Sequence, residues 1–153
     1  MIRELISKFN RSLSERMVSA RRHYKAPIKV WFDPDVNSER GRETARNASI
    51  LGETVDLSRT GVGFVVPNIR FKDKYLVGQE RALNVEIDLP NGKVSMRAIG
   101  RRYQQVGEHV STERFLVGAH ITGLEGEDRE TYERFLRYGP RRLKASDTGL
   151  EMS

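Results

Sequence analysis

The sequence predicts a mainly β fold, a small antiparallel barrel or sandwich closed by a helix. Six short segments alternate apolar and polar residues, which is typical of half-buried strands. Turn-forming residues separate them, and an amphipathic helical pattern follows the last one. Because six strands in one open sheet would leave a face uncovered, we expect the sheet to close on itself. With 153 residues the chain fits one domain, which we place at residues 20–139.

The first 19 residues are predicted to form a separate element, an N-terminal amphipathic helix. Their apolar residues recur at helical spacing, namely Ile2, Leu5, Ile6, Phe9, Leu13 and Met17. The opposite face carries both signs of charge, whereas a helix that lies on a membrane is usually basic. We therefore expect the apolar stripe to pack on the core or on a second copy of the chain.

The first three strands follow this helix. "IKVWF" at 28–32 alternates like a strand, and "ILGETVDL" at 50–57 and "VGFVV" at 62–66 follow. The segment 37–47 between the first two has almost no apolar content, so we predict a mobile loop there.

The next two strands form the clearest unit of the sequence. Residues 83–89 and 93–98 flank the turn-forming tripeptide Pro90-Asn91-Gly92, which predicts a β-hairpin. Its inward side chains are Val85, Ile87, Leu89, Val94, Met96 and Ala98. The alternation changes phase at 98–100, which indicates a bulge. The last strand, 114–124, directs Phe115, Val117, Ala119 and Ile121 to one side.

A closing helix begins near residue 125 with acidic residues and carries arginines towards its end, as the helix dipole favours. Gly139 and Pro140 are stop signals. We expect Tyr132, Phe135 and Leu136 to cover one opening of the sheet. The tail, 140–153, has a basic start and no periodicity, so we predict that it is flexible.

Composition narrows the classes of function. The net charge of +6 favours anionic partners, and the lack of cysteine removes thiolate chemistry and a disulfide framework. No segment approaches the length that spans a bilayer, so we expect a cytoplasmic protein. No metal-ligand spacing, nucleophile elbow or phosphate-binding loop is present, so we expect neither an enzyme nor a bound cofactor or metal.

Two segments could bind an anion together. "DLSRTG" at 56–61 contains Asp56 and Ser58, whose short side chains can bond to the local backbone, and Gly61, for which a structural turn would predict a positive φ. A basic segment at 21–25 precedes the first strand, and neighbouring guanidiniums can each grip a phosphate or a guanine edge. Taken alone, the two segments are also compatible with a structural turn and a solvated linker.

Together these segments resemble the PilZ family of bacterial cyclic di-GMP (c-di-GMP) receptors. That family has an R-x-x-x-R segment before its first barrel strand and an Asp/Asn-x-Ser-x-x-Gly turn, which residues 56–61 satisfy in full. The late strand "VGAHITGL" and the acidic start of the last helix also follow the family's order. The resemblance covers roughly residues 20–138 and implies a six-stranded antiparallel β-barrel with a C-terminal helix.

The resemblance implies a c-di-GMP site on the outer surface of the barrel. The residues expected to form it are Arg21, Arg22, Lys25, Asp56, Ser58 and Gly61. Lys25 stands where the family usually has its second arginine, and lysine keeps the charge but loses the planar fork. Because the basic segment joins the N-terminal helix to the barrel, ligand binding should order that segment, move the helix and alter a surface for a protein partner or a homodimer.

Two alternatives remain. Lys25 is compatible with a PilZ-type adaptor that no longer binds the nucleotide. The net charge, with Arg101, Arg102 and Tyr103 on one strand, is compatible with an RNA- or single-stranded-DNA-binding barrel. Such binding needs several aromatics among the cations, and only one accompanies this pair, so we do not expect a nucleic-acid polymer as partner.

Overall fold

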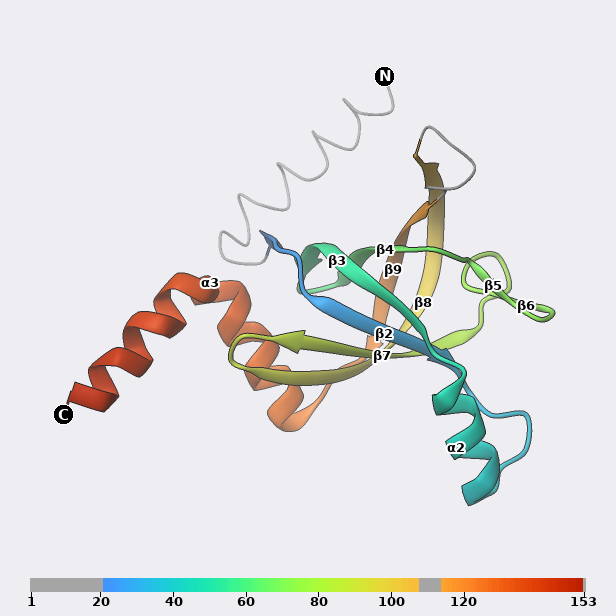
Figure 1. Cartoon of the computed structure of the whole chain (residues 1–153), viewed down its shortest axis with the longest axis horizontal. Helices are drawn as coiled ribbons and strands as arrows, with labels where there is room; N and C mark the ends of the chain where they lie inside the picture. The colour runs from blue at the N-terminus through green and yellow to red at the C-terminus, as the bar shows by residue number, and fades with distance from the viewer. Residues whose placement is uncertain (1–20, 108–113, 153) are drawn as a thin grey trace.

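The fold is a closed, six-stranded antiparallel β-barrel with a C-terminal helix, as the sequence predicts (Figure 1). The computed structural model describes residues 21–107 and 114–152, with side chains as far as residue 140. The helix predicted for residues 1–19 lies outside this range. The barrel strands are β2 (Pro27–Phe32), β3 (Ile50–Ser58), β4 (Gly61–Val66), β7 (Ala82–Leu89), β8 (Gly92–Val106) and β9 (Arg114–Gly123). They pair in the order β3-β2-β7-β8-β9-β4, and a β3–β4 pairing closes the ring.

Apolar side chains at alternate positions of the strands fill the interior of the barrel. The six inward residues predicted for the β7–β8 hairpin are all buried. Pairing of β8 with β9 shifts register on both sides of the segment 98–100, which confirms the predicted bulge. Of the four residues assigned to one side of β9, Val117 and Ala119 are buried, and Phe115 and Ile121 pack against the core.

A short strand, β1 (Arg21–His23), precedes β2 and lies on the same edge of β3. The two strands run in one direction along β3 with a break at residues 24–26. Thr54 bridges this break, because its hydroxyl donates to the carbonyl of Tyr24 (2.6 Å) and accepts from the amide of Ala26 (2.8 Å). Thr54 is fully buried, so both bonds are shielded from water.

The helix α3 (Gly126–Met152) covers one end of the barrel. Tyr132, Phe135 and Leu136 are buried there, as predicted, and Tyr24 meets Phe135 edge to face with ring centroids 4.9 Å apart. The helical backbone is interrupted at Gly139 (φ 69°, ψ 178°). Beyond this kink the backbone of 140–152 is helical, which the sequence did not predict, and the flexibility expected of this tail stays a prediction. Pro140 starts that second segment, where its fixed φ and missing N–H are tolerated.

The prediction of a loop at 37–47 is wrong, because this segment contains the helix α2 (Glu39–Asn47). Ser38 caps this helix by accepting a hydrogen bond from the amide of Gly41 (3.0 Å), with Glu39 in the first turn and Arg46 in the last. No residue of α2 is buried, so the helix adds nothing to the barrel interior, and an apolar pattern could not reveal it.

The connection from β4 to β7 holds a two-stranded sheet of β5 (Arg70–Phe71) and β6 (Lys74–Tyr75). Figure 1 shows this small sheet beside the barrel, away from α3. Within the described part of the chain, no helix has both the length and the apolar character needed to cross a membrane.

Candidate functional site

Pairing of β1 with β3 brings the two predicted motifs side by side. Arg21 lies opposite Ser58, Arg22 opposite Leu57, and His23 opposite Asp56. Directly opposed residues in an antiparallel pair share a face. Because Leu57 is fully buried, Arg21, His23, Asp56 and Ser58 occupy the outer face, and Arg22 starts from the inner one.

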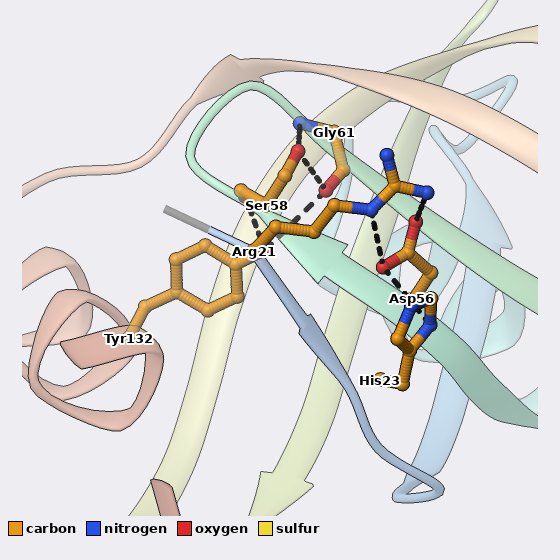
Figure 2. A network of polar contacts seen from close by, with 6 residues as sticks. All are labelled: Arg21, His23, Asp56, Ser58, Gly61 and Tyr132. Carbon is orange, nitrogen blue, oxygen red and sulfur yellow. Dashed lines mark hydrogen bonds and ion pairs between the residues drawn. The ribbon is translucent and has the colours of Figure 1, made fainter. Parts of the chain in front are cut away.

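The guanidinium of Arg21 is held by the carboxylate of Asp56 (Figure 2). Its Nε donates to Oδ1 at 3.1 Å, and its Nη2 lies 2.5 Å from Oδ2, which makes a bidentate ion pair. The Nδ1 atom of His23 is 3.6 Å from Oδ1. The side chains of Arg21 and Asp56 keep 36% and 25% of their surface exposed, so the pair stays within reach of a ligand.

Ser58 and Gly61 form the turn between β3 and β4. The Ser58 hydroxyl accepts from the amide of Gly61 (3.0 Å) and donates to its carbonyl (3.1 Å). The positive φ predicted for Gly61 is wrong, since this residue is not among those with left-handed backbone angles. Glycine is required for space instead: an added Cβ would lie 2.9 Å from the carbonyl oxygen of Ala119 on β9.

Tyr132 on α3 supports this turn from the end of the barrel. Its hydroxyl donates to the carbonyl of Ser58 at 2.6 Å, as Figure 2 shows, and the ring is fully buried. Burial raises the pKa of the Tyr132 phenol well above its usual range, and the negative charge of Asp56 acts in the same direction. The sequence identified Tyr132 as part of the apolar cap, but its hydrogen bond to the turn was not predicted.

Arg22 is directed away from the other site residues. Its Nε donates to the carbonyl of Leu136 (2.9 Å) and its Nη2 to the carbonyl of Arg137 (3.1 Å). These carbonyls end the first segment of α3, just before the kink, where a cation also interacts favourably with the helix dipole. The structure therefore places Arg22 as a link between β1 and α3.

Lys25 returns to the outer face. Along residues 21–26, exposed side chains alternate with more buried ones, and Lys25 falls in the exposed set with Arg21 and His23. Four of the six predicted residues thus lie on or shape one outer corner of the barrel, namely Arg21, Asp56, Ser58 and Gly61. Lys25 is exposed four residues beyond Arg21, and Arg22 is directed elsewhere. The corner combines an arginine cation with a carboxylate acceptor, so it suits an anion that also has hydrogen-bonding edges.

A cavity of about 440 Å³ lies elsewhere, between α2 and the β5–β6 sheet. Three of the charged residues that line it are in ion pairs: Lys74 is 2.6 Å from Asp35, and Asp33 is 2.7 Å from Arg97. The hydrogen bond from Arg97 lowers the pKa of Asp33, which stays ionised. None of the predicted site residues lines this cavity. Within 21–107 and 114–152, no cluster of three or more His, Asp or Glu side chains could hold a metal ion.

The fold and this corner define a small closed β-barrel with a basic strand laid against an Asp-x-Ser turn. The chain matches the PilZ domain over residues 19–138 and belongs to that family. No curated protein matches it.

Solved structures share the barrel at low sequence identity. The PilZ domain of YcgR from Escherichia coli, solved with c-di-GMP, is 10% identical with a TM-score of 0.51, over 83% of this chain and 96% of that domain. MrkH from K. pneumonia in its apo state is 14% identical (TM-score 0.55), over 82% of this chain and 51% of MrkH. The inhibitor of motility MotI/DgrA from Bacillus subtilis is 14% identical (TM-score 0.51), over 82% and 50% respectively. The chain therefore spans about half the length of MrkH and MotI, and these likenesses show a common fold.

Proposed function

We propose that this protein is a cytoplasmic c-di-GMP-binding effector without catalytic activity of its own. The observation that carries the proposal is the β1–β3 register, which sets Arg21 opposite Ser58 and beside Asp56. Membership of the PilZ family supports the choice of ligand, as does the YcgR domain solved with the same dinucleotide.

The chemistry of the corner matches the groups of this ligand. Cyclic di-GMP has two phosphate charges and two guanines, and guanine offers acceptors at O6 and N7 and a donor at N2. Arg21 supplies paired N–H donors to a phosphate or to the O6/N7 edge, and Lys25 adds a second cation. Asp56 accepts from guanine N–H groups, and the Ser58–Gly61 turn fixes the backbone around it.

The effector role follows from the position of β1. This strand continues directly from residues 1–20, so a ligand that engages Arg21 acts on the segment through which those residues join the barrel. We infer that ligand binding changes the placement of the N-terminal segment and thereby alters contacts with a protein partner or a second copy of the chain.

Calorimetric titration with c-di-GMP tests the proposal. The unmodified protein should bind the dinucleotide, and Arg21→Ala should weaken binding about 10- to 100-fold, the value of a bidentate contact. Ser58→Ala should also weaken it, because the turn loses its bracing hydroxyl. Arg101→Ala is a matched control, since Arg101 is an exposed arginine paired with Glu80 (2.8 Å), away from this corner. A flat isotherm for the unmodified protein at micromolar concentration rejects the proposal.

The second candidate is a PilZ-type adaptor that acts only through protein contacts, and Lys25 is the observation that favours it. Lysine provides one point-like donor where a guanidinium provides a fork. Lys25→Arg distinguishes the two candidates. In an effector it should tighten existing binding, whereas an adaptor should gain measurable binding only in the variant, or none at all.

A further inference from the structure

A row of four residues crosses the outer face of the barrel from the Asp56 corner. The register pairs Asp56 on β3 with Gly63 on β4, Gly63 with Gly118 on β9, and Gly118 with Arg102 on β8. Neighbouring strands are about 4.8 Å apart, so Asp56 and Arg102 are separated by about 14 Å of sheet. The two middle residues of the row, Gly63 and Gly118, have no side chain, and we call them the glycine shelf.

Both glycines face outwards. Val62 and Phe64 flank Gly63, and Val117 and Ala119 flank Gly118, and all four of these neighbours are buried in the barrel. The three atoms nearest to a Cβ added at Gly63 all belong to Asp56, and the closest is its Cβ at 3.6 Å. The sheet backbone is therefore uncovered next to the Arg21–Asp56 pair, and it offers a flat surface.

Arg102 covers the far end of the shelf, at Gly118. Its side chain lies across Gly118, because a Cβ added there would be 3.3 Å from Cγ and 3.7 Å from Nε of the arginine. Arg102 is exposed, and among the described residues its guanidinium makes no hydrogen bond or ion pair. Two other arginines of β8 differ in this respect, since Arg97 is bonded to Asp33 and Arg101 to Glu80.

We propose that the glycine shelf and Arg102 form the second half of the ligand site, where a guanine ring of the dinucleotide lies flat on the sheet. This inference rests on the proposed function and extends it to residues outside the two motifs. A purine ring needs a flat, uncovered surface, which Gly63 provides beside Asp56. The planar guanidinium of Arg102 stacks on the ring or takes its O6/N7 edge with paired donors. Arg21 and Arg102 then hold the ligand from opposite ends of the row.

Two substitutions test the proposal by calorimetric titration with c-di-GMP. Arg102→Ala should weaken binding about tenfold or more. Arg101→Ala makes the same change of charge one residue away and should leave affinity within about twofold, because that arginine is paired with Glu80. Gly63→Val should also weaken binding about tenfold or more, since its branched side chain would occupy the shelf.

Gly63→Val should keep the fold, so that a loss of binding by this variant reflects a blocked surface. Valine suits a strand, the backbone of Gly63 is not left-handed, and an added Cβ finds ordinary contact distances. Its thermal unfolding should match that of the unmodified protein. If Arg102→Ala and Arg101→Ala bind alike, or if folded Gly63→Val binds like the unmodified protein, the shelf proposal is overturned.

The failure of this inference is distinguishable from that of the proposed function. When the unmodified protein binds and Arg21→Ala is weaker, but Arg102→Ala and Gly63→Val are unchanged, the effector role stands and the shelf does not. When the unmodified protein gives a flat isotherm, both are rejected.

Discussion

Arg21 is opposite Ser58 in the strand register, yet its guanidinium is bonded to Asp56, two residues back along β3. The diagonal contact lays the arginine along the outer face, between the turn and His23 (Figure 2). A ligand therefore meets a cation whose orientation is already fixed, which lowers the entropic cost of binding. The same carboxylate competes with the ligand for the guanidinium, so Asp56 both orients Arg21 and limits its affinity for phosphate.

Arg21→Ala should have little effect on stability. The ion pair is partly exposed, and such pairs contribute about 1 kcal/mol or less to folding. Urea denaturation should show a free energy of unfolding within about 1 kcal/mol of the unmodified protein. A loss above 2 kcal/mol would mean that reduced ligand binding by this variant reflects a damaged fold.

Thr54→Val should destabilise the protein by about 2–4 kcal/mol, because it leaves the buried amide of Ala26 and the carbonyl of Tyr24 without their partner. Thr54→Ser is the matched control, since serine keeps the hydroxyl and loses only a methyl group. Denaturant midpoints measure both. Equal stability of the valine and serine variants would show that the hydroxyl does not hold β1 to the barrel.

Arg22→Ala should loosen α3. Two charge-assisted hydrogen bonds to the carbonyls of Leu136 and Arg137 are lost, at a cost of about 1–3 kcal/mol. Hydrogen exchange should speed up in the turns of α3 that precede Gly139 and change little in β7. Arg22 must leave these carbonyls to reach a ligand, so Arg22→Ala should reduce affinity less than Arg21→Ala. The reverse order would show that Arg22 moves to the ligand.

Tyr132→Phe should produce a stability difference that depends on pH. Near pH 8 the variant should be about 1 kcal/mol less stable, because the carbonyl of Ser58 loses its hydroxyl donor. The folded protein holds the pKa of this phenol above its ordinary value of 10.0, while the unfolded chain does not. Above pH 10 the unfolded chain releases this proton and the folded protein keeps it, so the stability of the unmodified protein falls by up to about 1.4 kcal/mol per pH unit.

The measurement is the free energy of unfolding of both proteins between pH 8 and 11. The advantage of the unmodified protein should be constant up to about pH 10 and shrink above it. Other tyrosines and lysines titrate in this range in both proteins and cancel in the difference. A constant difference up to pH 11 would show that Tyr132 ionises as readily in the folded protein as in the unfolded chain.

The barrel was predictable because its strands bury alternate residues and turn-forming residues separate them. The hairpin at Pro90-Asn91-Gly92 and the cap that contains Phe135 follow from apolar spacing. The helix α2 was missed because spacing reveals a helix only where one face is buried, and α2 buries nothing. The helical backbone after Gly139 was missed because the glycine and the proline that follow are equally good signals for an end and for a kink.

The motifs at Arg21 and Asp56 were identified from sequence, but the direction of each side chain was not. Whether Arg21 or Arg22 faces outwards depends on the register of β1 against β3, and three residues are too few for a pattern to set that register. For Gly61, a structural turn predicted left-handed backbone angles. In the structure glycine is required because the carbonyl oxygen of Ala119, on a strand almost 60 residues later, leaves no space for a Cβ. Long-range contacts of this kind leave no mark in a local stretch of sequence.

The kink of α3 at Gly139 has a consequence for how related chains vary. A Cβ at this position would lie 3.1 Å from the guanidinium carbon of Arg22, and the backbone there is left-handed. A larger residue at 139 would both strain the main chain and displace the arginine that holds the helix end. Positions 22 and 139 should therefore co-vary during evolution, with glycine retained wherever an arginine faces it.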